Sequence, residues 1–482
     1  MTTSTLRLLT VISIFIIVRL ITIIYFPLQD STEARYAEIA RIMAETGDWI
    51  TPYFDYDIPF WGKPPLVFWL EALSIKIFGF SDFSPRLPSL LATLGTARLI
   101  YIYLKNIRDE ESALWGVIIF LSTGLVYILS GVVILDPIFV FATTLAYISF
   151  LMVLQRKAYY WGYLFFIAIA LGLLTKGPLI LVIVGGTIGF WLLFSKKRWR
   201  VFTYYPWISG LTLMLFLTIP WYILAEQKTP GFLDYFIVGE HFQRFIDSGW
   251  QGDKYGTAHN EPHGYIIAAW LLVSLPWGAT ALLLFIRSLF PLKQAKQFLQ
   301  KAFNEINSFY IMWAIFTLLF FTFSGNVLST YVLPSLPALA IIMALYLPKY
   351  LKNREFKSKI ILYSLLIEPL LIMLALSYAT LYPQKIATEK YLMARYTKEA
   401  QKNEPLFYLD SVQFSARYYS QGNVKKIRSQ DLKAWMIKYP DRSFYLAVRH
   451  GRSKRLHEID ASMLEKRYTN SRYYLYKVTQ QH

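Results

Sequence analysis

Apolar runs of about twenty residues, the length that an α-helix needs to cross a bilayer, recur along most of the chain, and short polar stretches separate them. The first run is too long for the core of a signal peptide, so we expect it to be retained as a span. The pattern predicts an all-α polytopic membrane domain with about eleven to thirteen transmembrane helices plus helices on the membrane surface. We expect spans near residues 7–27, 86–104, 112–130, 137–154, 159–175, 178–194, 203–224, 263–287, 309–324, 331–348 and 358–381.

Lysine and arginine gather in short connections between these runs, and short basic loops stay in the cytoplasm. The apolar segment Leu66–Phe80 is short and contains Glu71 and Lys76, so we expect it to lie along the membrane surface as an amphipathic helix. This choice puts the N-terminus inside and everything after Tyr382 on the outer side. The basic connections that it leaves in the cytoplasm are Lys105–Glu111, Gln155–Lys157, Ser195–Arg200, Arg287–Lys301 and Lys349–Lys359.

The remaining polar connections then all lie on the outer face. The pattern therefore predicts that most of the chain's other charged loops face the same side of the membrane. We expect a membrane domain over residues 1–381, with long outer loops at 29–85 and 226–262. The shorter outer corners are Gly131–Asp136, Thr175–Pro178 and Ser324–Tyr331.

Residues 382–482 differ in character, because they are polar and rich in tyrosine. Strand-like pieces ("PLFYL", "FYLAV", "RYYLYKV") flank a helical piece ("SQDLKAWMIKY"), which predicts a small α/β extracytoplasmic domain. This part holds 20 Lys or Arg and 9 Asp or Glu, a net charge of +11 out of +18 for the chain. A solvated scaffold and a binding surface for an anionic partner are equally good interpretations of that charge.

Composition supports the membrane assignment, since 55% of the 482 residues are hydrophobic and only 17% are charged. The chain contains no cysteine. Disulfides, zinc–thiolate sites and thiol nucleophiles are therefore excluded, and any metal would need histidine and carboxylate ligands.

Three acidic residues at the outer face are candidates for chemistry. Asp30 and Glu33 lie at the mouth of the spans, where Thr32 can cap a helix that Gly47 ends. Asp136 enters a span just before a proline, and a carboxylate there marks a functional site or a structural pair. A helix cap is the structural alternative for Asp136, which could serve both purposes.

Three basic residues on the same face could hold an anion. Lys176 precedes a Gly-Pro turn, where free backbone N–H groups and an ammonium suit a phosphate. Snorkelling to the membrane interface would also explain this lysine. Lys63 offers a second cation, and the planar guanidinium of Arg244 matches phosphate oxygens.

The second long outer loop contains three of the six histidines, His241, His259 and His263. Their spacing matches no strict metal motif, so hydrogen bonding explains them better than zinc. His259 and His263 are the candidates should a divalent metal take part.

Acids, cations and aromatic residues beside lipid indicate a reaction on an amphiphile with an anionic headgroup, in which a carboxylate deprotonates the acceptor. The sequence has no Walker motif or dinucleotide-type glycine-rich loop. The donor must then arrive already activated and already in the membrane.

Several segments resemble one known family in chain order: "TEARYAEIARIMAETGDWITPYFDYDIPFWGKPPL", "RLPSLL", "LDPIF", "LTKGPL", "GEHFQRF" and "LSTYVLPSLPALA". They look like the bacterial branch of the protein mannosyltransferase superfamily, and in particular like its lipid A aminoarabinose transferase-like group. The resemblance implies a GT-C fold for residues 1–381, a polyprenyl-phosphate-linked sugar as donor, and transfer at the outer face of the cytoplasmic membrane.

The resemblance also implies roles for residues. The family's first outer loop carries the catalytic carboxylate in an Asp-Glu pair before Arg-Tyr, and the matching positions here are Thr32 and Glu33 before Arg35 and Tyr36. Glu33 or Asp30 is therefore the expected base, with Asp136 orienting the acceptor. Donor phosphate binding is expected at Lys63, Lys176 and Arg244, and substrate binding at Arg35, Tyr36, Glu240, His241 and Tyr331.

Two departures from the family pattern indicate a different sugar or acceptor. The chain reads Gly62-Lys63-Pro64 where the family often has a glutamate before the lysine, which weakens a metal site built on that acid. Asn326 stands in a turn where the family has a lysine.

The resulting hypothesis is an inverting glycosyltransferase that moves a sugar from undecaprenyl phosphate to lipid A or another envelope glycan. Transfer to a protein hydroxyl is the first alternative. A lipid-linked sugar flippase is less favoured, because a transporter places polar residues near the bilayer midplane and often shows repeated halves. A structural assembly factor is the third interpretation.

Overall fold

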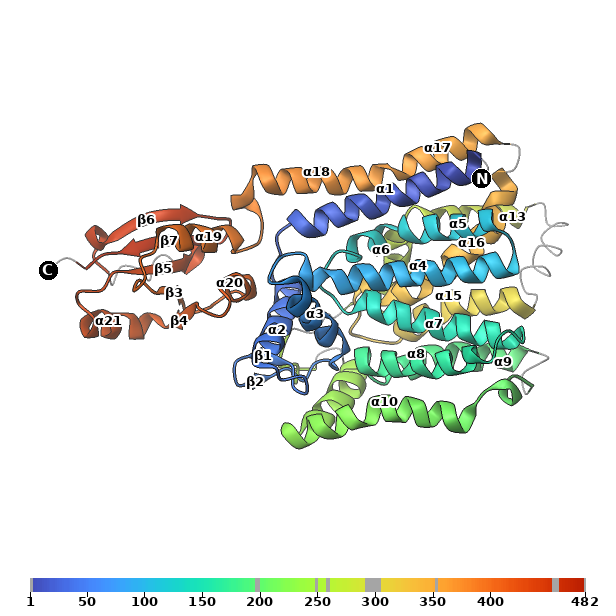
Figure 1. The fold of residues 1–482 in the computed structure, drawn as a ribbon, viewed down its shortest axis with the longest axis horizontal. Helices are drawn as coiled ribbons and strands as arrows, with labels where there is room; N and C mark the ends of the chain where they lie inside the picture. The colour runs from blue at the N-terminus through green and yellow to red at the C-terminus, as the bar shows by residue number, and fades with distance from the viewer. Residues whose placement is uncertain are drawn as a thin grey trace.

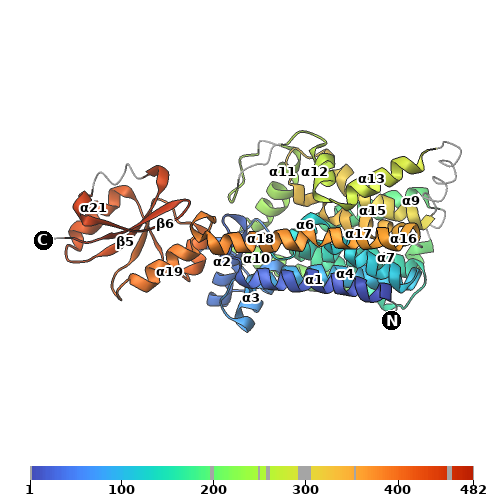
Figure 2. The same ribbon diagram turned by 90° about the horizontal axis from the view of Figure 1, so that it is seen from above.

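The computed structural model describes residues 3–195, 200–247, 250–256, 261–290, 305–351, 354–452 and 459–480. Most of them form helices that run along one long axis, and a small sheet domain stands beyond one end of this bundle (Figure 1). Seen from above, α1 (Thr3–Tyr25) and α18 (Ile367–Leu381) lie side by side along the bundle (Figure 2).

The membrane part consists of long apolar helices and short helical turns. The helices are α4 (Leu87–Ile107), α5 (Glu110–Leu121), α6 (Gly124–Leu129), α7 (Asp136–Leu154), α8 (Tyr160–Lys176), α9 (Gly186–Phe194), α10 (Trp207–Lys228), α12 (Tyr265–Val273), α13 (Trp277–Ser288), α15 (Glu305–Thr322), α16 (Leu336–Leu351) and α17 (Glu355–Leu365). The turns are η1 (Ser84–Arg86), η2 (Leu181–Gly185), η3 (Arg200–Tyr204) and η5 (Ser329–Ser335).

Six helical stretches among the described residues are long and apolar enough to cross a membrane, and α12 with α13, bent by 105°, makes a seventh if the pair is one span. Three further apolar helices, at residues 160–176, 181–194 and 306–322, are shorter. The structure therefore confirms a helical polytopic membrane domain, whereas the larger number of spans stays a prediction.

Two expected spans are broken for local reasons. The stretch 112–130 divides into α5 and α6 at Ser122 and Thr123, whose hydroxyls donate to carbonyl oxygens four residues back at 2.6 and 2.7 Å. Such back-bonding competes with the helical ladder and bends helices. The stretch 263–287 breaks before Pro276, which has no N–H to continue the ladder.

The loop that we expect to be the first outer loop forms helices at the end of the bundle that faces the sheet domain. It contains α2 (Thr32–Thr46), the small hairpin β1 (Tyr53–Asp55) and β2 (Ile58–Pro59), and α3 (Leu66–Phe78) (Figure 1). Gly47 ends α2 with φ +71°, as predicted, but Ser31 occupies the N-cap in place of Thr32. The predicted amphipathic helix is α3, which is not among the spans.

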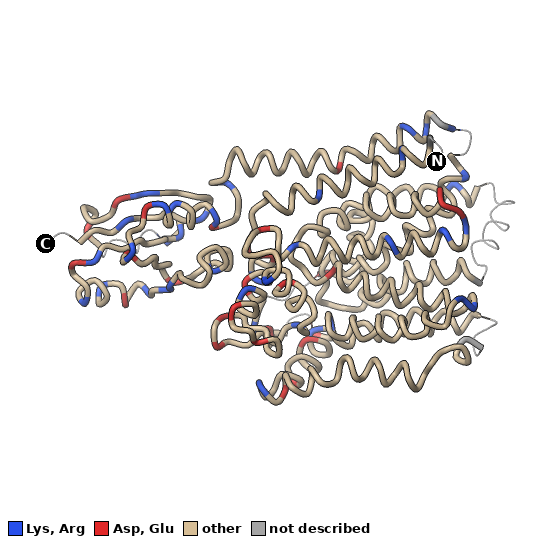
Figure 3. The backbone as a smooth tube through the Cα atoms, in the orientation of Figure 1, with Lys and Arg blue, Asp and Glu red and all other residues tan. Residues whose placement is uncertain are grey.

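Charged residues are concentrated at the two ends of the bundle, and the middles of most helices carry few of them (Figure 3). The N-terminus lies at one end, whereas α2, α3 and the sheet domain lie at the other. This arrangement brings the polar connections that we expected on the outer face to one end of the molecule.

The C-terminal part is a five-stranded mixed sheet in the order β4-β3-β5-β7-β6, with helices on both faces. Because successive side chains of a strand point to opposite faces, Phe407 and Leu409 pack with α21, whereas Leu406 and Tyr408 pack with α19 and α20. The strands expected from the sequence are β3, β5 and β7. The elements are η6 (Pro383–Lys385), α19 (Lys390–Glu399), β3 (Leu406–Leu409), α20 (Phe414–Tyr419), β4 (Lys425–Ile427), α21 (Ser429–Lys438), β5 (Phe444–Arg449), η8 (Ala461–Met463), β6 (Leu464–Thr469) and β7 (Tyr473–Val478).

Candidate functional site

A buried ion pair joins two neighbouring helices at the end of the bundle that faces the sheet domain. Asp136 is the first residue of α7 and Lys176 is the last residue of α8, so the chain direction brings both to the same end of the bundle. The Nζ atom of Lys176 lies 2.7 Å from Oδ1 of Asp136, and both side chains are about one-tenth exposed. A buried charge of either sign is costly without its partner, so each residue stabilises the other.

A second ionic cluster is centred on Glu240. Its Oε2 atom is 3.0 Å from Nζ of Lys63 and 3.1 Å from Nη1 of Arg244, and Oε1 accepts a hydrogen bond of 3.2 Å from the hydroxyl of Tyr235. Burial alone would raise the pKa of the Glu240 carboxyl, but the two cations outweigh it and hold this pKa below its usual value. Glu240 is therefore an anion that holds two cations. It lies in the π-helix η4 (Asp234–Gln243), and Arg244 follows in α11 (Arg244–Ile246).

His241 connects the two ionic clusters through the backbone. Its Nε2 atom lies 2.9 Å from the carbonyl oxygen of Lys176, and its Nδ1 atom lies 2.7 Å from that of Phe236. Burial lowers the pKa of this imidazole, which favours its neutral form. Because both ring nitrogens face carbonyl oxygens, His241 is placed to position the turn after α8 and not to bind a metal.

Aromatic rings surround the Lys176 ammonium. Its Nζ atom lies 5.3 Å from the ring centre of Phe139 and 5.5 Å from that of Tyr331. Tyr36, on the buried face of α2, lies within the electrostatic field of Asp136 and Lys176, and burial raises the pKa of its hydroxyl. Of the two tyrosines expected to bind substrate, Tyr331 therefore lies beside the Lys176 ammonium.

The structure adds residues that sequence reasoning missed. Lys254 places its Nζ atom 4.1 Å from the ring centre of Trp61 and 5.0 Å from that of Tyr235, and Asp253 lies 3.4 Å from Arg244. Cations over aromatic faces are common structural contacts. No local spacing connects residues 61 and 254, so only the fold could show this contact.

Arg35 lies at the edge of this group. Its Nη1 atom donates to the carbonyl oxygen of Tyr255 at 2.5 Å, and its guanidinium stacks 5.2 Å from the ring centre of Tyr36. The five described cations at the site outnumber its three carboxylates, which gives a net charge of +2. These residues are Lys63, Lys176, Arg244, Lys254 and Arg35 against Asp136, Glu240 and Asp253.

Glu33 lies apart from these cations. Its Oε1 atom is 2.8 Å from Nε of Arg86 and 3.3 Å from the backbone nitrogen of Val133, and its Oε2 atom accepts 2.9 Å from the backbone nitrogen of Gln29. Arg86 is 2% exposed. The pair ties α2 to the start of α4 and to the corner that leads to Asp136. The signal that could have revealed it in the sequence is an arginine at the start of an apolar run.

Asp30 contacts the sheet domain instead of the cations. Its Oδ2 atom lies 2.7 Å from Nη2 of Arg472, and its Oδ1 atom accepts 2.9 Å from the backbone nitrogen of Ser415. Of the three acids expected to take part in catalysis, Asp136 is the one that the structure places with the cations.

The described residues contain no group of three or more histidine, aspartate or glutamate side chains that could hold a metal ion. His263 is exposed, with Nδ1 3.2 Å from the carbonyl oxygen of Thr322. His259 lies outside the described residues.

Comparison with known proteins agrees with this architecture. Residues 4–236 match the family model described as dolichyl-phosphate-mannose-protein mannosyltransferase. The chain is 30% identical over 339 residues to an undecaprenyl phosphate-alpha-4-amino-4-deoxy-L-arabinose arabinosyl transferase of Yersinia pestis, covering 69% of this chain and 57% of the relative. A protein of the same name from Erwinia tasmaniensis is 29% identical over 318 residues, 65% of this chain and 54% of that protein. The chain thus spans somewhat more than half the length of these relatives.

The fold resembles that of a solved structure over nearly its whole length. The crystal structure of ArnT from Cupriavidus metallidurans bound to undecaprenyl phosphate has a TM-score of 0.77 at 16% sequence identity, covering 97% of each chain. The apo structure of the same protein has a TM-score of 0.76 at 16% identity, covering 99% of this chain and 98% of that one. The resemblance recognised in the sequence motifs is thereby confirmed: the chain is similar in sequence to these arabinosyl transferases and shares the fold of ArnT.

Proposed function

We propose that the protein is an integral-membrane glycosyltransferase that moves a sugar from a polyprenyl-phosphate donor to lipid A or another envelope glycan. Transfer takes place at the outer face of the bacterial inner membrane. The observation that carries the proposal is the pair of ionic clusters, Asp136–Lys176 and Lys63–Glu240–Arg244, joined by His241 and carrying an excess of positive charge. The names of the relatives support the donor class.

The cations have donors to spare for a phosphate. A lysine ammonium has three N–H donors and a guanidinium has five, whereas Glu240 has only two oxygens for both. Phosphate oxygens therefore bind to Lys63 and Arg244 without displacing Glu240. The charge of +2 complements a phosphodiester and, still better, the more negative phosphate monoester that leaves after transfer.

We assign the base to Asp136, in place of the Glu33 or Asp30 expected from the sequence. When the donor phosphate attracts Lys176, Asp136 loses its counter-ion and becomes free to accept a proton. The acceptor hydroxyl then attacks the anomeric carbon and gives its proton to Asp136. The bond from that carbon to the phosphate oxygen breaks, and polyprenyl phosphate leaves with inversion at the carbon. Tyr36 and Tyr331 line the position of the sugar.

The boundaries of the two parts belong to the same proposal. Residues 1–381, with outer loops 29–85 and 226–262, form the catalytic membrane domain. Residues 382–482 form a periplasmic domain, on the same side as the site.

Binding of undecaprenyl phosphate to the purified full chain in nanodiscs is the first test. We expect the lipid to raise the melting temperature of the wild type. In Lys63→Ala and in Arg244→Ala, the lipid should raise the melting temperature much less. The probe is undecaprenyl phosphate without an attached sugar, so the identity of the natural sugar need not be known. Equal stabilisation of all three proteins, or of none, would refute the proposed phosphate site.

Transfer itself is tested with lipid A and undecaprenyl phosphate-linked 4-amino-4-deoxy-L-arabinose as the first donor. Mass spectrometry of lipid A and envelope glycans from a deletion strain identifies the natural sugar and acceptor. A flippase would leave the sugar on its lipid carrier in both experiments.

Transfer to a protein hydroxyl is the second candidate, because the family model that matches residues 4–236 is that of a protein mannosyltransferase. Labelled sugar would then appear on periplasmic proteins and not on lipid A. The flippase alternative is less favoured, since charged residues gather at the ends of the helices and not at their middles (Figure 3).

A further inference from the structure

The sheet domain is attached to the first outer loop by contacts that link distant parts of the chain. Helix α20 packs against α2. The hydroxyl of Tyr418 donates to the carbonyl oxygen of Ser81 at 2.8 Å, and Nη1 of Arg417 lies 2.5 Å from Oδ2 of Asp55. The sheet domain therefore touches the loop that carries α2, one of the elements of the candidate site.

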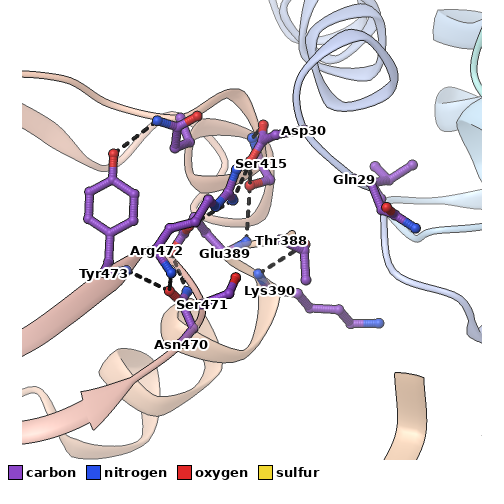
Figure 4. A network of polar contacts seen from close by, with 12 residues as sticks. Gln29, Asp30, Thr388, Glu389, Lys390, Ser415, Asn470, Ser471, Arg472 and Tyr473 are labelled. Carbon is purple, nitrogen blue, oxygen red and sulfur yellow. Dashed lines mark hydrogen bonds and ion pairs between the residues drawn. The ribbon is translucent and has the colours of Figure 1, made fainter. Parts of the chain in front are cut away.

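Arg472 stands at the centre of this interface, just before β7 (Figure 4). Its Nη2 atom lies 2.7 Å from Oδ2 of Asp30, in the membrane domain, and 2.8 Å from Oε1 of Glu389, in the sheet domain. The side chains of Asp30 and Glu389 are only 3% and 0% exposed. One guanidinium thus serves two buried carboxylates that come from different domains.

Among the described residues, the other groups that donate to these two carboxylates are neutral. Asn470 donates to Oε2 of Glu389 at 2.8 Å, and both the backbone nitrogen and the hydroxyl of Ser415 donate to Asp30. Burial raises the pKa of Glu389, against the opposing effect of Arg472. Without the guanidinium, two adjacent carboxylates would stay buried with only neutral donors, which is strongly unfavourable.

The network continues from Asp30 toward the candidate site through short links. In the opposite direction, the backbone nitrogen of Asp30 donates to the carbonyl oxygen of Ala387, in the C-terminal part, at 3.1 Å. The preceding residue, Gln29, donates its backbone N–H to Glu33, which also accepts from the backbone nitrogen of Val133. Val133 lies three residues before Asp136, in the corner that begins α7.

We propose that Arg472 is a positioning residue, which fixes the sheet domain on the first outer loop and thereby holds α2 and the corner before Asp136 in place. The catalytic part of this inference, the effect of Arg472 on turnover, rests on the proposed function. The mechanical part, the ordering of the first outer loop by Arg472, does not depend on that function. In the described part of the chain, Lys63 and Arg244 form ion pairs with Glu240 and Asp253, which lie outside this network. Donor binding is therefore expected to survive the loss of Arg472 while turnover falls.

Hydrogen exchange of the full chain in nanodiscs tests the mechanical part. In Arg472→Ala we expect exchange of the amides of residues 29–36 to rise at least about tenfold, because the N-terminal turn of α2 opens locally more often. Arg472→Lys keeps a charge at the interface and should recover part of the protection. Arg428→Ala is the matched control, since Arg428 pairs with Asp431 on the exposed side of the sheet domain. Unchanged exchange in Arg472→Ala would overturn the inference.

Kinetics test the catalytic part on the same proteins. We expect kcat to fall about tenfold or more in Arg472→Ala, with a smaller effect in Arg472→Lys and with the affinity for undecaprenyl phosphate unchanged. A normal kcat together with raised exchange in residues 29–36 would refute the catalytic part. A wild-type protein with no transferase activity would refute the proposed function, and the exchange data would still decide the mechanical role. If Arg472→Ala does not fold, the comparison is made with Arg472→Lys, which must then show the raised exchange and lowered kcat.

Discussion

The imidazole of His241 lies 2.9 Å from the backbone carbonyl oxygen of Lys176, and this contact joins two ionic clusters that are far apart in the sequence. One cluster is carried by α7 and α8, and the other by the second long outer loop together with Lys63 of the first. Their relative position therefore depends on a side chain that carries no charge at neutral pH.

The turn at Gly177 should be intolerant of any side chain. Its φ of +63° is unfavourable for other residues, and a Cβ atom there would lie 2.6 Å from the Phe236 ring and 3.2 Å from Cε1 of His241. We expect Gly177→Ala to lower the free energy of unfolding by roughly 2 kcal/mol or more and to weaken undecaprenyl phosphate binding. Gly185→Ala is the control, because a Cβ atom at this helical position meets nothing within 4 Å. Equal melting temperatures for the two variants would contradict this account.

His241 should make stability depend on pH. Burial lowers its pKa, whereas the unfolded chain has the ordinary value of about 6.5. The unfolded state therefore binds more protons below that pH, and stability falls as the pH drops through about 6.5 until it passes the folded pKa. We expect His241→Gln to be less stable near neutrality but to lose less stability between about pH 7.5 and 5.5.

Thermal melts across this range compare the wild type with His241→Gln and with His263→Gln, a change at an exposed histidine. The His263 variant should keep the pH dependence of the wild type. Parallel curves for all three proteins would show that His241 is not the group responsible.

The charge of Glu240 should stabilise the ligand-free protein and weaken its affinity for anions. In Glu240→Gln, Lys63 and Arg244 lose their shared counter-charge, so we expect a lower melting temperature without ligand. The same two cations then become better partners for a phosphate, and undecaprenyl phosphate should raise the melting temperature more than in the wild type. Glu45→Gln, at a half-exposed carboxylate on α2, serves as the control. A smaller ligand shift in Glu240→Gln would argue against a phosphate at this position.

The three outer acids should give three different phenotypes. We expect Asp136→Asn to lower kcat by about 10²-fold or more while the protein still binds undecaprenyl phosphate. Glu33→Gln should chiefly lower stability, by about 3–5 kcal/mol, because it leaves Arg86 buried without a counter-charge. Asp30→Asn should loosen the contact with Arg472 and resemble the Arg472 variants in hydrogen exchange.

Activity assays and thermal melts of the three proteins together distinguish these roles. If Glu33→Gln or Asp30→Asn were stable but inactive while Asp136→Asn stayed active, the catalytic base would be Glu33 or Asp30, as expected from the sequence.

The sequence by itself determined the architecture of this protein. Apolar runs, basic connections and the helix stop at Gly47 are local or periodic features, and a bilayer or a helix terminus responds to them wherever they occur. The three strands β3, β5 and β7 could likewise be read from short apolar runs. The same information gathered Lys63, Lys176 and Asp136 at one face.

Only the tertiary structure decided which charges meet. Asp30 and Glu33 are three residues apart, yet one binds Arg472 in the sheet domain and the other binds Arg86 at the start of α4. Likewise, Lys254 stacks on Trp61 although nearly two hundred residues separate them. Ion pairs and ring contacts act over a few ångströms, and no periodicity in the sequence encodes a partner that only the packing of separate elements brings within that range.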